Sequence, residues 1–188
     1  MIKLVWEQDI FAEELTLIQS DSVRKWTTDC LNKFNHAFYT MGASSSGKYH
    51  PKVSLGLGGL VKHTKICVHF AVELRRIHWW NWEQDTFDLI LSALLLHDGG
   101  KYMGENTTIS MKDHPLRVIP LLDTVEGISN RQRTTIVDCI QSHMGQWDNE
   151  GELPVPIGLE TVEFFVHLCD YLASRKILDD YIAGGELG

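Results

Sequence analysis

The stretch LSALLLHDGGK, residues 91 to 101, constrains the fold more than any other part of the chain. An apolar run leads directly into a histidine and an aspartate, so the segment that must be buried carries two polar side chains with it. Burial of an unpaired charge is costly, so the fold must supply partners for His97 and Asp98. The following Gly99 and Gly100 are typical of a helix C-cap, because glycine adopts the left-handed conformation there at little cost.

The rest of the sequence favours helices. Capping residues or a first-turn proline mark several helix starts, at Ser20 or Asp21, Asp85-Thr86, Pro115 and Ser129. The first of these helices is expected to run to about Tyr39, and the last helix of the chain to span about residues 159–183. Residues 41–59, rich in Gly and Ser, indicate a long loop. Strand signals are nearly absent, so we predict an all-α helical bundle.

Length and composition indicate one globular domain. The 188 residues suffice for a single core, and 44% of them are hydrophobic. No apolar run approaches the roughly 20 residues that cross a bilayer, and the N-terminus lacks the features of a secretory signal. The four cysteines contain no C-x-x-C pair, which argues against a disulfide scaffold. We therefore expect a cytoplasmic protein with no membrane partner.

The formal net charge of −8 bears on the partners. An acidic surface repels the phosphate backbone, so broad binding to duplex nucleic acid is not expected. Binding of small anionic ligands is still compatible with this charge where basic residues lie close together. The oligomeric state is left open by the sequence.

Histidines and aspartates form a candidate metal site, distributed over several predicted helices: His63, His97, Asp98, His114, His143 and Asp170. Helical bundles build metal sites from side chains that project inward from several helices. Imidazole with carboxylate suits Mn, Fe, Co, Ni or Zn. The set contains no thiolate, which argues against a structural zinc site.

This ordered set, in the contexts GGLVKHTK, LLLHDGGK, DHPL, SHMGQW and FVHLCDYLASRK, resembles the HD-domain metal-dependent phosphohydrolases. The similarity is greatest to the branch with extra histidines between the HD pair and the final aspartate. That branch includes HD domains of bacterial 3′→5′ exoribonucleases and of cyclic-dinucleotide phosphodiesterases. The resemblance implies an HD-type bundle over residues 58–176, preceded by a helical extension and loop over residues 1–57, within a single domain 1–188.

The resemblance also implies two divalent metal ions. The first would be held by His63, His97, Asp98 and Asp170, and the second by His114 and His143, with Asp98 bridging both. Two such ions activate a water molecule and stabilise charge on attacking and leaving oxygens.

Lys101 resembles the lysine that helps to position the substrate phosphate or to polarise the attacking water in this family. Asp98 and Lys101 are therefore the expected catalytic residues. Gly99 departs from the family pattern, which usually has a small aliphatic residue there. This departure is expected to loosen the turn that carries Lys101.

Other residues are candidates for substrate binding. Trp147 is the preferred aromatic residue for stacking on a base, and Arg175 and Lys176 are expected at the rim of the site. His167 lies three residues before Asp170 on the same side of a helix, so it is a candidate hydrogen-bond partner of a ligand.

These observations predict a phosphohydrolase that cleaves a phosphomonoester or phosphodiester of a nucleotide or short oligonucleotide through a metal-activated water. Two alternatives use the same site, dNTP triphosphohydrolysis and cyclic-dinucleotide cleavage. A third is a non-catalytic regulator that binds metal or nucleotide.

Overall fold

The structure is a computed structural model that describes residues 10–103, 113–145, 154–156, 158–177 and 179. Regular secondary structure in these residues is entirely helical, which confirms the predicted all-α class. The elements in chain order are α1 (Ala12–Thr16), α2 (Asp21–Leu31), α3 (His36–Thr40), the 3₁₀ helix η2 (Lys52–Ser54), α4 (Gly59–Leu74), the 3₁₀ helix η3 (His78–Trp80), α5 (Gln84–Leu96), α6 (His114–Arg117), α7 (Ile119–Leu122), α8 (Asn130–Ser142) and α9 (Val162–Ala173).

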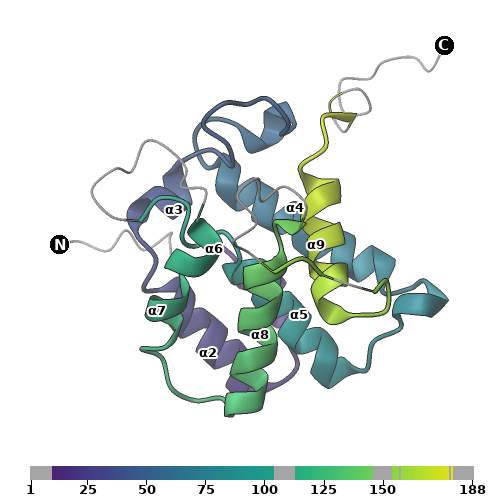
Figure 1. Ribbon diagram of the computed structural model, residues 1–188. Helices are drawn as coiled ribbons and strands as arrows, with labels where there is room; N and C mark the ends of the chain where they lie inside the picture. Colours follow the sequence, from purple (N-terminus) through teal and green to yellow (C-terminus); the bar gives the residue numbers. More distant parts are fainter. Residues whose placement is uncertain (1–9, 104–112, 146–153, 157, 178, 180–188) are drawn as a thin grey trace.

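Helix α5 is the central helix of the bundle. It packs against α2, α4, α8 and α9, and Figure 1 shows these helices grouped around it. From Phe87 to Leu96 every residue except Leu89 is buried. A helix that is apolar on nearly all sides is stable only when neighbours cover it. Because α5 ends inside the bundle, His97 and Asp98, which directly follow it, are buried as well.

The predicted first helix is interrupted. Its start is as expected, because the Ser20 hydroxyl accepts a hydrogen bond from the backbone N–H of Val23. Helix α2 then ends at Leu31, and Asn35 begins the separate helix α3 by accepting from the backbone N–H of Ala37. The prediction of one helix to Tyr39 was therefore wrong, since it overlooked Asn35 as a second N-cap.

Helix α5 begins at Gln84, one residue before the expected Asp85, and has no side-chain cap. The starts of α6 and α8 agree with the sequence signals. Pro115 lies in the first turn of α6, and Ser129 forms the expected capping box at the start of α8. Helix α9 is shorter than predicted. It begins after the N-cap Thr161 and ends at Ala173, with Ser174 and Arg175 outside the helix.

The segment 41–58 forms a compact loop rather than an open one. Backbone hydrogen bonds close it on itself, including 2.9 Å between the Gly58 nitrogen and the Thr40 oxygen. At its end, a Cβ on Gly59 would lie 2.3 Å from the carbonyl oxygen of Ser54, so only glycine fits there. The Tyr102 hydroxyl donates to the carbonyl oxygen of Gly42 at 2.6 Å. The loop is thereby fastened to the segment that follows His97 and Asp98.

One hydrophobic core joins the N-terminal helices to the rest of the bundle. Trp26 on α2 is 1% exposed, and its indole N–H donates to the carbonyl oxygen of Val125 at 2.9 Å. The four cysteines are free and buried, as expected without a disulfide framework. None of the helices in the described ranges combines the length and the apolar character that crossing a membrane requires.

Asp88 ties α5 to the start of α2. Its carboxylate is 1% exposed and accepts hydrogen bonds from the backbone N–H groups of Gln19 and Ser20 and from the Gln84 side chain. The substitution Asp88→Ala leaves these donors unsatisfied and should lower the free energy of unfolding by about 2–3 kcal/mol. Urea denaturation followed by circular dichroism measures this. Asp85→Ala, on the exposed side of the same helix, should change it by less than about 0.5 kcal/mol.

Candidate metal centre

All of the predicted metal ligands come together at one place in the bundle. They come from five helices or their ends: His63 from α4, His97 and Asp98 from the turn after α5, His114 from α6, His143 from the end of α8, and Asp170 from α9. Five of the six side chains are at most 3% exposed, and Asp170 is 17% exposed. The sequence order therefore predicted a real cluster, and the Asp170 side is where the cluster meets solvent.

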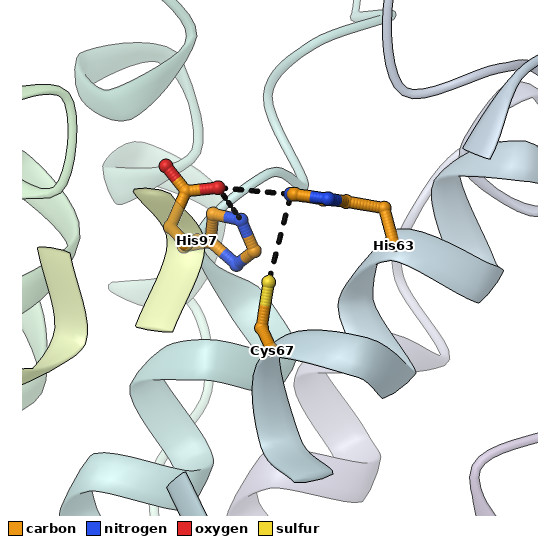
Figure 2. A group of neighbouring side chains, drawn as sticks. His63, Cys67 and His97 are labelled. Carbon is orange, nitrogen blue, oxygen red and sulfur yellow. Dashed lines mark hydrogen bonds and ion pairs between the residues drawn. The ribbon is translucent and has the colours of Figure 1, made fainter. Parts of the chain in front are cut away.

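The first group of donors lies around one oxygen of Asp98. Nε2 of His97 is 3.2 Å from Oδ2 of Asp98, and Nε2 of His63 is 3.6 Å from the same atom. Asp170 completes this group, with its Oδ1 at 2.9 Å from Nε2 of His63 and 3.7 Å from Nε2 of His97. Figure 2 shows how the side chains of His63 and His97 converge from different helices.

The second group lies around the other oxygen of the same carboxylate. Nε2 of His114 is 3.0 Å from Oδ1 of Asp98, and Nε2 of His143 is 3.6 Å from it. The two Nε2 atoms of His114 and His143 are 3.0 Å apart. Asp98 therefore presents one oxygen to each group, which is the arrangement that a bridging ligand requires.

Hydrogen bonds orient two of the histidines for metal binding. Nδ1 of His97 donates to the carbonyl oxygen of Leu94 at 2.7 Å, and Nδ1 of His143 donates to the carbonyl oxygen of Ile140 at 2.6 Å. Each neutral ring then carries a lone pair on Nε2, which points into the cluster. Metal-binding histidines are commonly oriented in this way by a backbone carbonyl.

The spacing of the donors is compatible with ligands of a shared cation, and the same distances also suit direct hydrogen bonds such as that between His63 and Asp170. Two ligands about 2.1 Å from one ion and at right angles lie about 3.0 Å apart. The nitrogen–oxygen separations of 2.9, 3.0 and 3.2 Å are close to this value. Nε2 of His97 and Oδ1 of Asp98 are buried and have no hydrogen-bond partner among the described residues, despite these close neighbours. The residues present therefore fit a metal centre.

The charges of the cluster also favour a cation. Burial alone would raise the pKa of Asp98, but the charges of His97 and Lys101 hold that pKa well below its usual range. Burial alone would lower the pKa of His97, but the carboxylates of Asp98 and Asp170 outweigh it and raise that pKa to about 10. Burial lowers the pKa of His114 to about 4. The buried carboxylate of Asp98 and the partly exposed carboxylate of Asp170 are thus stabilised by positive charge beside them, from protons or from metal ions.

Lys101 lies against Asp98. Its ammonium group is 2.6 Å from Oδ2 of Asp98 and donates to the carbonyl oxygen of Ala43 at 3.1 Å. The residue is only 8% exposed. Lys101 thus joins the cluster to the 41–58 loop, and it adds a fixed positive charge at the edge of the first group.

Close packing, not a left-handed backbone conformation, explains why residues 99 and 100 are glycines. Neither residue has a positive φ, so the expected left-handed C-cap was wrong. A Cβ on Gly99 would lie 2.2 Å from Cζ of Phe34, and a Cβ on Gly100 would lie 2.1 Å from the carbonyl oxygen of His114. The Phe34 ring occupies the space that an alanine at residue 99 would need. The turn carrying Lys101 is therefore tightly packed and not loosened.

The substrate-binding roles of Trp147, Arg175 and Lys176 stay predictions. Trp147 lies outside the described residues. Arg175 stacks on the Tyr171 ring, with 4.3 Å between the guanidinium carbon and the ring centre, and Lys176 is exposed. His167 does support a ligand residue, but through the main chain, since its Nδ1 donates to the carbonyl oxygen of His143 at 2.6 Å.

Two residues near the centre were missed by the sequence interpretation. Cys67 lies one helical turn after His63 and joins the first group of donors, so this group is not free of thiols. His50, from the 41–58 loop, lies with its ring centre 5.2 Å from that of His63, and its buried Nδ1 has no hydrogen-bond partner among the described residues. The four-residue spacing of His63 and Cys67 was a usable signal, whereas nothing local marked His50.

Comparisons with family models, with characterised proteins and with solved structures gave no match to this chain. The case for the site therefore rests on the geometry of its own residues.

Metal binding by this centre should depend on pH. Because the pKa of His97 is about 10, a bound cation displaces a proton at neutral pH. The apparent affinity for Mn²⁺ should therefore rise as the pH rises from 6 to 8, by roughly tenfold per pH unit for each proton released. Competition with a fluorescent chelator at each pH measures this dependence. An affinity that stays constant over this range would show that no proton is exchanged.

A methyl group at residue 99 should be poorly tolerated. Gly99→Ala should lower the free energy of unfolding by about 1–3 kcal/mol, because the new Cβ overlaps the Phe34 ring. Adding Phe34→Leu should recover part of this loss, since the smaller side chain leaves room for the methyl group. Thermal and urea denaturation of the two single variants and the double variant measure the coupling. Strictly additive losses would contradict the proposed contact.

Proposed function

We propose that this protein is a metal-dependent phosphohydrolase of the HD superfamily. Its proposed reaction is hydrolysis of a phosphomonoester or phosphodiester in a nucleotide or short oligonucleotide. The observation that carries the proposal is the position of Asp98, whose two carboxylate oxygens face two different groups of histidines. A carboxylate shared in this way is suited to bridge two ions, and two adjacent ions suit phosphate ester hydrolysis.

The residues have distinct proposed roles. His63, His97 and Asp170 hold the first ion, His114 and His143 hold the second, and Asp98 contacts both. When bound, the two ions supply an activated water and compensate the charge of the phosphate. The partial exposure of Asp170 supports access from solvent, which a catalytic metal site requires and a closed structural site lacks.

Lys101 is the proposed substrate-contacting residue of the chain itself. Its ammonium group lies at the edge of the first donor group, 2.6 Å from Asp98. A phosphate oxygen bound beside Asp98 would meet this positive charge. Because Lys101 is held by the carbonyl oxygen of Ala43, the 41–58 loop fixes where that charge lies.

The proposal is tested by hydrolysis and metal content measured on the same protein samples. With Mn²⁺, Co²⁺ or Zn²⁺ added, the protein should hydrolyse bis-p-nitrophenyl phosphate or a member of a nucleotide panel. Asp98→Asn should lose bound metal and activity together. Lys101→Met should keep its metal but lower kcat by about 10²-fold, since a charge beside the phosphate is removed. Asp85→Asn, on the exposed face of α5, serves as the control and should match the unchanged protein.

The products distinguish the candidate substrates. Release of inorganic phosphate indicates a monoesterase, release of triphosphate from a dNTP indicates a triphosphohydrolase, and linear dinucleotides from cyclic ones indicate a phosphodiesterase. Metal-loaded protein that binds a nucleotide without turnover would instead support the non-catalytic regulator. Protein that binds no metal would overturn the proposal.

A further inference from the structure

Cys67 has a position that the proposed function does not use. It lies four residues after His63 on α4, and residues with this spacing lie on the same face of a helix. Its side chain is fully buried. Figure 2 shows the sulfur of Cys67 directed toward the His63 ring, on the same side as His97.

The separation between the sulfur and the imidazole matches that of two ligands on one ion. Sγ of Cys67 is 3.6 Å from Nε2 of His63. A thiolate at about 2.3 Å and an imidazole nitrogen at about 2.1 Å from one ion lie about 3.1 Å apart at a right angle and about 3.6 Å apart at a tetrahedral angle, so the observed distance corresponds to the wider of these angles. The donor atoms of Cys67, His63, His97 and Asp170 all lie within 4.8 Å of one another. The thiol is therefore within ligand distance of the first metal position.

A second observation points to a ligand at this position independently of the thiol. Nε2 of His97 is fully buried, faces the same group of donors and has no hydrogen-bond partner among the described residues. Leaving a buried polar atom unsatisfied costs about 1–3 kcal/mol, which either a proton on this nitrogen, 3.2 Å from Oδ2 of Asp98, or a bound cation would offset. Cys67 therefore adds a sulfur to a group of donors in which a buried nitrogen already faces the first metal position.

The neighbouring cysteine is a natural comparison. Cys169 is buried and directly precedes Asp170 on α9, but it is absent from the donor groups found in the described part of the chain. Adjacent helical residues point about 100° apart, so Cys169 and Asp170 do not face the same point. Cys67 points in the same direction from α4 as His63, whereas Cys169 does not point in the same direction from α9 as Asp170.

We infer that Cys67 is a ligand of the first metal ion. The first position is then a mixed nitrogen, oxygen and sulfur site, which selects a thiophilic divalent ion such as Zn²⁺, Fe²⁺ or Co²⁺. The second position, with His114, His143 and Asp98, offers nitrogen and oxygen only and accepts a harder ion such as Mn²⁺. The thiol proton leaves to solvent when the sulfur binds the ion. This inference rests on the proposed metal centre and adds that its two positions select different metals.

Cobalt spectroscopy tests the inference without an activity assay. A thiolate bound to Co²⁺ produces an intense near-ultraviolet charge-transfer absorption, which nitrogen and oxygen ligands alone do not. The cobalt-loaded full-length protein should show this absorption, and Cys67→Ser should lose it. Cys169→Ser is the matched control and should keep it. In Cys67→Ser, the preference of the first position for Zn²⁺ over Mn²⁺ should fall by about tenfold or more.

The outcomes separate this inference from the proposed function. Cobalt bound without the thiolate absorption, or an absorption lost only in Cys169→Ser, would overturn the role of Cys67 while hydrolysis could still be measured. The absorption without any hydrolysis would support Cys67 and reject the function. Failure to bind cobalt would reject the role of Cys67, and failure to bind Mn²⁺ and Zn²⁺ as well would reject both. If Cys67→Ser does not fold, X-ray absorption of the zinc-loaded unchanged protein decides, since a sulfur neighbour at about 2.3 Å is either present or absent.

Discussion

Asp98 is 1% exposed, and its pKa nevertheless lies well below the usual range. A buried carboxylate keeps its charge only where compensating groups surround it, because the desolvation penalty is several kcal/mol. The charges of His97 and Lys101, with the imidazoles of His114 and His143, meet this requirement. This requirement constrains the bundle, because α4, the end of α5, α6 and the end of α8 all bring a side chain to the carboxylate of Asp98.

The apolar core holds these groups in place. Helix α5 is covered along most of its length, so its end has little freedom, and the turn beyond it is confined by close contacts on both sides. Gly100 lets this turn pass directly over the backbone of His114, while Phe34 packs where a side chain on Gly99 would be. The 41–58 loop adds hydrogen bonds to Lys101 and Tyr102. Packing therefore holds the side chains of the cluster in place, which would lower the cost of binding a metal ion there.

The two halves of the centre differ in chemistry. The second half consists of imidazoles and one carboxylate oxygen, whereas the first also contains Asp170 and the Cys67 thiol. Only the first half includes a partly exposed ligand, Asp170, and it is also the half that Lys101 adjoins. The partly exposed carboxylate, the extra positive charge and the softer donor therefore coincide on one side. The first group of donors is thus the one open to solvent, and the second group is more enclosed.

The sequence by itself determined the helical class, most of the helix starts and the six residues of the cluster, because helical periodicity, capping residues and an ordered set of histidines and aspartates are local signals. Tertiary structure decided what depends on segments far apart in the chain. The reason for Gly99 lies in Phe34, the partner of Lys101 includes Ala43, and the neighbour of His63 is His50. The sequence interpretation missed Cys67, whose place in the first group became clear only when His97 and Asp170 were placed beside it. Close contacts between distant segments depend on how the helices pack, and no local pattern in the sequence records that packing.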